Sequence, residues 1–242
     1  DVTRLVRRPA QQPDEVTWQP SQGQLDPATV AAADVVVNLT GASIGDHRWT
    51  ARYKGELRSS RVDPAGTLAR TISTLPAGDR PRVLLQASGA GWYGDTGDRA
   101  VTEEDPAGNT FLADLSRVWE AAARPAEDAG TRVVLMRTAP VIGPDGGLIK
   151  PLMVPFKLGA GAKLGGGRQW MAWVALVDWL GAAEFLIERE DIAGPVNVVS
   201  QNQCTNAEFT RAFGRAVHRP ALFAVPGLAL DLALGELAGE LQ

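Results

Sequence analysis

The sequence predicts an α/β fold, in which a Rossmann-like, doubly wound parallel sheet is followed by a small C-terminal lobe. Short β-rich runs alternate with helical patterns along most of the chain, which is typical of βαβ units and a parallel sheet. The runs Val35–Val37 and Val133–Met136 are continuously apolar. Strands that are buried on both faces have this composition, so we expect a sheet that helices cover on both sides.

The elements of this sheet are expected in a regular order. Helices are expected over Arg52–Thr74 and Thr110–Ala129, and the second carries apolar residues at helical spacing and is closed by Gly130. A strand pattern begins at Val2 with no element before it. The expected strands are Val2–Arg7, Val16–Trp18, Val35–Leu39, Val83–Ala87, Val133–Arg137 and Val196–Val199.

The second part of the chain has a different composition. Gly and Pro are dense from residue 144 to residue 167, so loops are expected there. An amphipathic helix is expected near Leu176–Glu188. Thr205–Glu208 has the spacing of a capping box and opens a helix that reaches about Val217. A last apolar helix is expected over Leu228–Leu241.

The composition argues against several classes of protein. The chain has 242 residues, 45% of them hydrophobic, and a net charge of −4, so it lacks the basic excess of a nucleic-acid binder. No apolar run approaches the roughly 18 residues that cross a bilayer, and no signal peptide is visible, so no membrane is expected. The single cysteine, Cys204, suits a reducing compartment and predicts a cytoplasmic location. With His47 and His218 far apart, no metal site is expected.

The run Val83–Gly94 is the strongest indication of a ligand site. An apolar strand ends in small residues, with Ser88 at its carboxyl tip and Tyr93 just beyond. Ligands of open α/β sheets bind outside the carboxyl ends of the strands, so both side chains are expected to face a site. Gln86 stands where the nucleophile elbow G-x-S-x-G has its first glycine, which argues against a hydrolase.

Two other strand ends suggest a dinucleotide. Arg7 and Arg8 come at the end of the first predicted strand, where arginines suit the 2′-phosphate of NADP because a guanidinium binds phosphate at two points. The alternative is a solvated basic turn. Leu39, Thr40 and Gly41 follow the strand at Val35 and form a turn at which an adenosine or a pyrophosphate can approach the backbone. The alternative there is an ordinary βα turn.

Two later stretches suggest a substrate lobe. Gly159–Gly167 imitates a dinucleotide fingerprint, but no strand precedes it and no helix follows it directly, so we expect a flexible loop over the substrate. Trp170 and Trp173 lie in an aromatic-rich run before the helix near Leu176. They either pack in the core or, equally, form the floor of a substrate pocket.

A set of motifs occurs in order along nearly the whole chain and carries a family resemblance. The motifs are Asn38–Gly41, His47–Thr50, Ser60-Arg61, Ala87–Gly94, Trp119–Ala122, Arg137-Thr138, Gly143–Gly147, Pro155–Gly159, Gly167–Trp170 and Gly194–Asn197. With them the chain resembles the atypical extended short-chain dehydrogenase/reductases known as epimerase family proteins, which are NAD(P)-dependent epimerase/dehydratase-like.

The resemblance implies a Rossmann fold that binds NADP(H), with a small C-terminal substrate lobe. It places Arg7 and Arg8 at the 2′-phosphate, Leu39, Thr40 and Gly41 beside the adenosine, and Ser88 at the catalytic serine position. Thr138 and Val141 would run beside the nicotinamide, and Arg61 and Ala87 belong to the cofactor-binding motifs. Many members pair through the helix that corresponds to Thr110–Ala129, which allows a homodimer. The domains implied are residues 1–145, an NAD(P)-binding Rossmann-like body in which the family's first, glycine-rich βα unit is expected to be missing; 146–195, substrate-lobe loops interleaved with a late Rossmann helix; and 196–242, a truncated C-terminal domain.

One departure from the larger superfamily concerns the chemistry. Its classical members use a Tyr-x-x-x-Lys pair, in which the lysine helps the tyrosine to exchange a proton with the substrate. Members of the atypical group that this chain resembles generally lack the pair. Here Tyr53 and Tyr93 are followed four residues later by Leu57 and Gly97, so no such pair exists. The expected function is an NADP-dependent oxidoreductase or epimerase that uses Ser88 and Tyr93 on an unidentified small carbonyl, hydroxyl or sugar-nucleotide-like substrate. The alternative is a catalytically weak or inactive NADP(H)-binding regulatory module.

Overall fold

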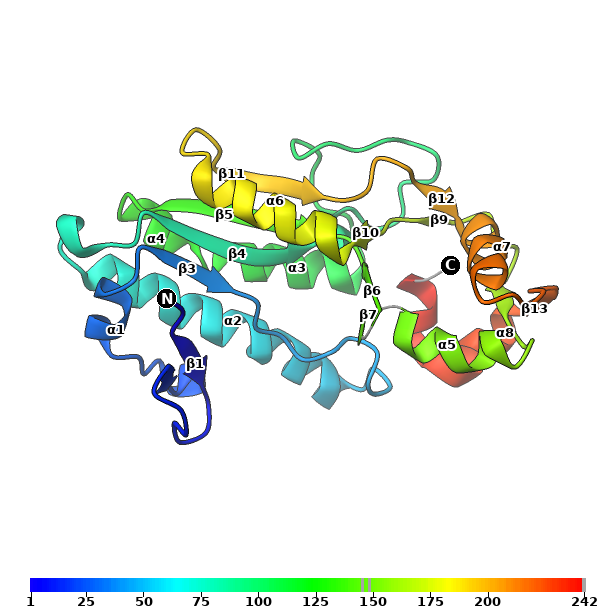
Figure 1. The fold of residues 1–242 in the computed structure, drawn as a ribbon, viewed down its shortest axis with the longest axis horizontal. Helices are drawn as coiled ribbons and strands as arrows, with labels where there is room; N and C mark the ends of the chain where they lie inside the picture. Colours follow the sequence, from blue (N-terminus) through cyan, green and yellow to red (C-terminus); the bar gives the residue numbers. More distant parts are fainter. Residues whose placement is uncertain (145, 148, 241–242) are drawn as a thin grey trace.

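The computed structural model describes residues 1–144, 146–147 and 149–240. At its centre lies a parallel sheet of four strands in the order β11–β5–β4–β3 (Figure 1). These strands are β3 (Val35–Asn38), β4 (Val83–Gly89), β5 (Arg132–Thr138) and β11 (Gly194–Val198). Each neighbouring pair is parallel, so the α/β fold with a parallel sheet that the sequence predicts is confirmed.

The first two predicted strands form a separate parallel pair. Strand β1 (Arg4–Val6) lies beside β2 (Glu15–Thr17), with Leu5 opposite Val16. This pair lies close to the N-terminus in Figure 1, below the end of β3. Strand β1 is shorter than the predicted Val2–Arg7, and β2 has the predicted length but begins one residue before the predicted Val16–Trp18.

Helices cover the sheet on both faces (Figure 1). On one face lie α1 (Pro27–Ala31), α2 (Ala51–Thr74), α3 (Phe111–Ala121) and α4 (Arg124–Asp128), and on the other lies α6 (Leu176–Glu188). Successive side chains of a strand point to opposite faces. Accordingly, Leu84 packs with residues of α2 and α4, whereas Val83 and Leu85 pack with residues of α6. The doubly wound arrangement follows from strands that are apolar on both sides.

The helix expected over Thr110–Ala129 is divided into two. Helix α3 ends at Ala121 and α4 begins at Arg124. Pro125 is the physical reason, because a proline ring in a continuous helix would collide with the carbonyl four residues earlier. Gly130 follows α4 with a φ of +94°, a left-handed conformation that suits glycine.

The stretch rich in Gly and Pro holds regular structure where loops are expected. It contains β7 (Gly146–Gly147), which pairs with β6 (Val141–Gly143), then α5 (Ile149–Lys157) and β8 (Ala162–Leu164). Strand β8 pairs in parallel with β13 (Phe223–Val225), far along the chain. The expectation of a flexible loop over Gly159–Gly167 is therefore corrected at Ala162–Leu164, which is a strand. A partner strand some 60 residues later supplies ladder bonds that local composition does not reveal.

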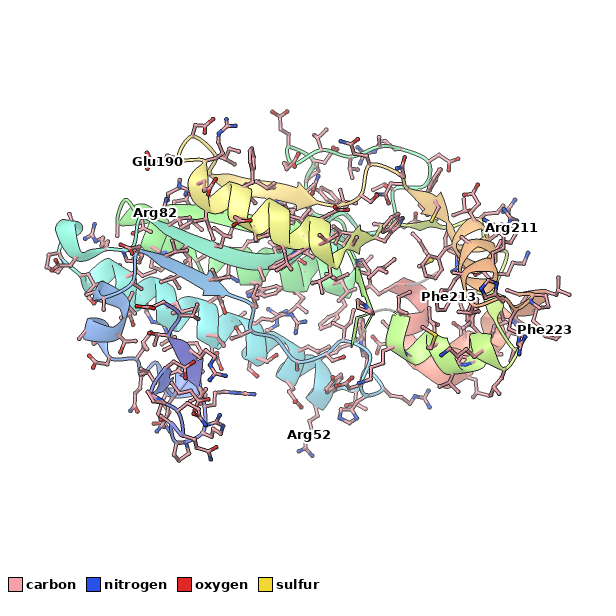
Figure 2. All side chains as sticks on the ribbon, viewed as in Figure 1. Arg52, Arg82, Glu190, Arg211, Phe213 and Phe223 are labelled. Atoms are coloured by element: carbon pink, nitrogen blue, oxygen red, sulfur yellow. The ribbon has the colours of Figure 1, made fainter. Side chains whose placement is uncertain are left out.

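The C-terminal elements gather at one end of the molecule (Figures 1 and 2). Strand β9 (Trp170–Met171) pairs with β12 (Cys204–Thr205), β10 (Val174–Ala175) leads into α6, and Thr205 closes the predicted capping box of α7 (Asn206–Ala216). The rings of Phe156 on α5 and Phe213 on α7 lie 4.6 Å apart. The last predicted helix is instead α8 (Gly227–Leu234) and a 3₁₀ helix, η4 (Gly235–Glu240), because Gly235 with a φ of +61° ends α8.

Parts of two predictions fall outside the described residues. Leu241, the predicted end of the last helix, is one of these, and residue 145, the predicted end of the first domain, is another. The division of the chain at residues 145 and 195 stays a prediction. None of the helices in the described ranges combines the length and apolarity that a membrane crossing needs.

Candidate functional site

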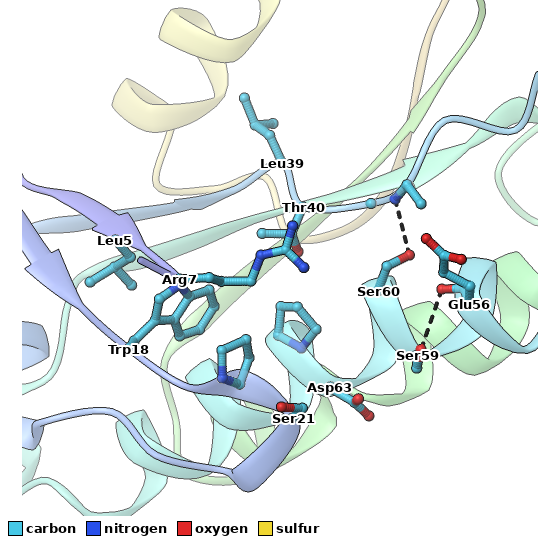
Figure 3. A pocket seen from close by; sticks show the side chains of 14 residues that line it. Leu5, Arg7, Trp18, Ser21, Leu39, Thr40, Glu56, Ser59, Ser60 and Asp63 are labelled. Carbon is cyan, nitrogen blue, oxygen red and sulfur yellow. Dashed lines mark hydrogen bonds between the residues drawn. The ribbon is translucent and has the colours of Figure 1, made fainter. Parts of the chain in front are cut away.

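A cavity of about 430 Å³ opens between the carboxyl ends of β1 and β3 and the flank of α2 (Figure 3). It brings together four of the residues predicted to bind a cofactor, Arg7, Leu39, Thr40 and Gly41. Its lining consists of Leu5, Arg7, Trp18, Pro20, Ser21, Leu39, Thr40, Gly41, Ala42, Glu56, Ser59, Ser60, Asp63 and Pro64. Three segments that are distant in the sequence thus meet at one hollow.

The two neighbouring arginines at the end of β1 have different surroundings. Arg7 extends into the cavity toward Thr40 (Figure 3). In the described ranges its guanidinium has no carboxylate partner. Arg8 instead donates two hydrogen bonds to Glu15, of 2.8 and 2.7 Å, and does not line the cavity. The predicted pair of phosphate ligands is thus divided, and the role of Arg8 at a phosphate stays a prediction.

Glu15 is the residue that holds Arg8 in place. Its side chain is only 1% exposed, and its carboxylate also accepts a 2.9 Å hydrogen bond from the backbone N–H of Gln11. The hydrogen bonds from Arg8, and next that from Gln11, lower the pKa of Glu15 to about 2. The carboxylate is therefore ionised at neutral pH and fixes the loop between β1 and β2.

The turn after β3 is held from both sides. Buried Asn38 donates to Gln86 at 2.8 Å and accepts from the Thr40 hydroxyl at 2.7 Å. On the other side, the N–H of Ala42 donates to Ser60 of α2 at 3.0 Å. A Cβ on Gly41 would lie 3.0 Å from the Arg61 guanidinium carbon, so glycine allows the turn to lie against α2.

Arg61 is a second cation near the cavity. Its guanidinium carbon lies 5.1 Å from the centre of the Trp119 ring, and it donates to the carbonyl of Leu57. Burial lowers its pKa from the ordinary arginine value. Arg61 thus lies directly behind Gly41, where the resemblance places a cofactor contact.

Ser88 at the tip of β4 is turned into the protein. The residue is only 4% exposed, and its hydroxyl donates a 2.7 Å hydrogen bond to Glu120 of α3. Glu120 also accepts two hydrogen bonds from Arg137 of β5, of 2.9 and 3.1 Å, in a buried ion pair. The catalytic role of Ser88 stays a prediction, and its proton has an acceptor inside the protein.

Tyr93 belongs to the same buried network. It ends η3 (Ala90–Tyr93), the 3₁₀ turn after β4. Arg137 donates a 3.1 Å hydrogen bond to the phenol oxygen, and the phenol donates in turn to Asn197 of β11 at 2.7 Å. Ser88 and Tyr93 are therefore linked through the ion pair between Glu120 and Arg137. The catalytic role of Tyr93 stays a prediction as well.

The guanidinium of Arg137 is fixed on all sides. It also donates to the carbonyl of Glu103 at 3.2 Å and stacks on the Trp92 ring at 3.8 Å. Burial works to lower its pKa, but the hydrogen bonds with Glu120 and Tyr93 outweigh this effect, so its pKa is raised. A permanent cation thus touches the phenol oxygen.

The other predicted site residues lie around this network. Ala87 precedes Ser88 in β4, and Thr138 ends β5, where its hydroxyl accepts a 3.1 Å hydrogen bond from Trp179. Val141 begins β6, which pairs with β10. Their roles as cofactor contacts stay predictions.

The two tryptophans of the predicted substrate pocket lie farther along the chain. Trp170 is half exposed and donates to Asp98 at 2.8 Å, and Trp173 donates to the carbonyl of Asn202 at 3.1 Å. Neither residue lines the cavity beside Arg7. Their substrate role stays a prediction.

Sequence reasoning did not assign a role to Arg137, Glu120 or Asn197. One signal was available, because Arg137 ends the apolar run of the predicted strand Val133–Arg137, and Glu120 follows Trp119 on the buried face of a helix. Buried arginines and glutamates are almost always paired. That rule indicates a partner for each charge, although it does not say which residue the partner is. In the described part of the chain, no cluster of three His, Cys, Asp or Glu side chains could hold a metal ion.

The parallel sheet with helices on both faces is the fold of a Rossmann-like α/β protein. Residues 13–199 match the NAD dependent epimerase/dehydratase family, and the chain belongs to this family. It is 43% identical to an epimerase family protein of Mycobacterium bovis over 239 residues, which cover 99% of this chain and 78% of that relative.

Solved structures that are similar to this chain include two at 30% sequence identity. One is human epimerase family protein SDR39U1 with NADPH, which has a TM-score of 0.86 and 30% identity and covers 98% of this chain and 79% of that chain. The other is the nucleoside-diphosphate sugar epimerase of Corynebacterium glutamicum, with a TM-score of 0.75 and 30% identity, covering 100% of this chain and 52% of that chain.

Proposed function

We propose that this protein binds NADP(H) and is an oxidoreductase, or an epimerase that works through transient hydride transfer. Its substrate would be a small carbonyl or hydroxyl compound or a sugar-nucleotide-like molecule. The observation that carries the proposal is the cavity where Arg7 meets the turn Leu39–Gly41. The NADPH in the similar human structure supports the choice of cofactor.

The residues of the cavity fit an adenosine that carries a 2′-phosphate. A guanidinium binds phosphate at two points, and Arg7 has no carboxylate to compete with a phosphate in the described ranges. Glu56 and Asp63 line the cavity from α2, which disfavours a phosphate on that side. Leu5 and Trp18 supply apolar walls for the base. Arg61, behind Gly41, is the second cation near the cofactor.

In the proposed reaction the cofactor supplies or accepts the hydride, and the protein handles the proton. Tyr93 is the phenol that exchanges a proton with the substrate oxygen. Ser88 donates its own proton to Glu120, so its oxygen would accept a hydrogen bond from the hydroxyl of a hydroxyl substrate. Thr138, Val141 and Ala87 would form the wall beside the nicotinamide, and Trp170 and Trp173 would contact the substrate.

A regulatory module that binds NADP(H) is the second candidate. It is favoured by one observation: Tyr93 is 8% exposed, and both it and Ser88 are hydrogen-bonded within the protein. A screen of carbonyl and hydroxyl compounds, followed by NADPH absorbance at saturating protein, distinguishes the two candidates. Turnover that Tyr93→Phe lowers strongly, to a measurable residual rate, supports the enzyme. Tight NADPH binding without turnover of any compound supports the module.

The cofactor assignment is tested by titrating NADPH and NADH against the full chain and following cofactor fluorescence. Arg7→Ala should weaken NADPH binding by about tenfold or more, because a charge-assisted hydrogen bond contributes about 1.5–3 kcal/mol. NADH binding should change by less than about threefold, since NADH has no 2′-phosphate. Arg8→Ala is the matched control and should affect NADPH less than Arg7→Ala does. Equal losses for both cofactors would contradict the role of Arg7.

The remaining expectations concern surroundings and partners. We infer a cytoplasmic location from the single cysteine, Cys204. The partners would be small molecules rather than nucleic acid, in keeping with the net charge of −4. Pairing of two copies through α3 stays a prediction, which light scattering would test.

A further inference from the structure

We propose that Arg137 is the positioning residue of this site: it holds the Tyr93 hydroxyl and takes the role that lysine has in a Tyr-x-x-x-Lys pair. The inference rests on the proposed function, in which Tyr93 exchanges the proton. The fixed cation of the site is then Arg137 of β5, a strand that is distant in sequence from Tyr93.

The first step is that a fixed cation contacts the phenol. Arg137 is 3% exposed and donates a 3.1 Å hydrogen bond to the Tyr93 oxygen. In the described ranges no lysine is hydrogen-bonded or ion-paired to Tyr93. Charge-assisted hydrogen bonds are about twice as strong as neutral ones. Arg137 therefore supplies the positive charge for which the chain has no suitably spaced lysine.

The second step is that this cation cannot turn away. Two donors of Arg137 are occupied by the carboxylate of Glu120, at 2.9 and 3.1 Å, and its face lies on the Trp92 ring. The planar guanidinium has a rigid arrangement of donors. With Nε and Nη2 on Glu120, the remaining nitrogen, Nη1, donates to the phenol and to the carbonyl of Glu103.

The third step is that the direction of the phenol proton is set. Because the Tyr93 oxygen accepts from Arg137, its proton goes to its other partner, Asn197, at 2.7 Å. A substrate oxygen would take the place of Asn197 as the acceptor. When the proton moves, the O–H bond of Tyr93 breaks and an O–H bond to the substrate forms. The phenolate keeps the hydrogen bond from Arg137 until solvent returns the proton.

The first arm of the test needs no substrate. The chain has two tyrosines, so ¹³Cζ-tyrosine labelling of the full chain gives two NMR signals, assigned with Tyr53→Phe and Tyr93→Phe. This carbon reports the hydrogen bonding of the phenol. Arg137→Lys should move the Tyr93 signal and leave the Tyr53 signal in place. The matched control is Arg132→Lys at the opposite end of β5, whose guanidinium donates to the carbonyls of Leu186, Ile187 and Ile192.

A second variant guards against loss of folding. Removing one partner of a buried ion pair leaves an uncompensated charge, so Arg137→Met is made together with Glu120→Gln. The glutamine oxygen still accepts from Ser88, and both buried charges are gone. The Tyr93 signal should move further in this double variant than in Arg137→Lys. If the Tyr93 signal in both variants stays within the change that Arg132→Lys produces, the proposal is overturned.

The second arm uses a compound turned over in the NADPH screen. Arg137→Lys should lower kcat by about 10- to 100-fold, a part of what a positioned proton donor contributes. The KM for the compound and the affinity for NADPH should stay within about threefold, because only the proton step is affected. In the Tyr93→Phe background, Arg137→Lys should cause no further loss, since it acts through that phenol.

The two arms separate this proposal from the proposed function. An equal loss of kcat in the presence and absence of the Tyr93 hydroxyl overturns the positioning role while leaving the enzyme intact. Absence of turnover together with a displaced Tyr93 signal overturns the proposed activity, yet it supports Arg137 as the residue that holds the phenol. If Arg132→Lys and Arg137→Lys both raise KM and lower kcat to the same extent, Arg137 has a structural role only, which contradicts the proposal.

Discussion

At the scale of single residues, the Glu15 carboxylate binds one of two adjacent arginines and leaves the other available for a ligand. Arg7 and Arg8 follow β1 directly, but only Arg7 lines the cavity. Glu15, opposite Arg4 in the ladder of β2, pairs with Arg8. Arg7 has no such partner in the described ranges and faces the cavity. Because Glu15 pairs with Arg8 and not with Arg7, two side chains of the same chemistry have different surroundings.

Glu15 makes the stability of this region depend on pH. Its pKa in the folded protein, about 2, lies below the ordinary value of a glutamate, so the unfolded chain binds the proton more readily. The stabilisation is therefore complete above the ordinary value and is lost as the pH falls through that value toward about 2. Thermal unfolding of the parent and of Glu15→Gln, followed from pH 7 to pH 2.5, should show a higher Tm for the parent at pH 7 and a gap that closes on acidification.

The partner variant serves as a control for this prediction. Arg8→Ala removes the hydrogen bonds that lower the pKa of Glu15, so its Tm should also fall at pH 7 and approach that of the parent in acid. A gap between parent and Glu15→Gln that is constant across the pH range would contradict the assignment.

At the scale of elements, the sequence predicts what depends on local pattern. The apolar runs that become β4 and β5 carry their own signal, and so does the capping box at Thr205. The sequence does not predict helix α5, because Pro155 and the surrounding glycines suggest loops. The sequence does not predict strand β8 either, because its partner β13 lies far along the chain. Local composition cannot reveal a ladder that closes at long range.

The candidate site divides in the same way. Ser88, Tyr93, Arg7 and the turn Leu39–Gly41 can be found from the sequence because each stands at the end of a strand pattern. The network that joins Ser88 to Tyr93 runs through α3 and β5, as Glu120 and Arg137. Such contacts depend on how a helix is placed on a sheet, and spacing within one element does not determine that placement.

The turn η3 is held by the loop that follows it. The N–H of Gly108 donates to the carbonyl of Trp92 at 2.8 Å, and a Cβ on Gly108 would lie 2.4 Å from the carbonyl oxygen of Tyr93. Because backbone cannot yield as a flexible side chain does, Gly108→Ala should push the loop off η3. We expect a loss of about 1–3 kcal/mol in the free energy of unfolding in urea and a displaced ¹³Cζ signal of Tyr93.

A second glycine provides the control. Gly78 lies in η2 (Ala77–Asp79), and a Cβ there would meet nothing within 4 Å. Gly78→Ala should therefore change the free energy of unfolding by no more than about 0.5 kcal/mol. If Gly108→Ala behaves like Gly78→Ala, the loop does not hold Tyr93 in place.

At the scale of the whole molecule, the last described helix, η4, packs against residues from the first half of the chain. Leu237 of η4 belongs to the same buried cluster as Trp49, Tyr53, Leu57 and Leu115, which come from α2, its approach and α3. Lys54 of α2 also pairs with Glu236 of η4. Exposed ion pairs contribute little, so the apolar cluster is expected to carry this attachment. The C-terminal segment and the parallel-sheet body thus share one core.

This shared core predicts how the molecule unfolds. Leu237 is 7% exposed, so Leu237→Ala should lower the free energy of unfolding in urea by about 2–4 kcal/mol, through lost burial and the cavity left behind. Leu232 of α8 is 78% exposed, and Leu232→Ala, the same change in chemistry, should cost no more than about 0.5 kcal/mol. Because body and segment share their core, both variants should unfold in one transition with the slope of the parent. Equal costs for the two variants, or a separate early transition, would mean that η4 lies on the body without stabilising it.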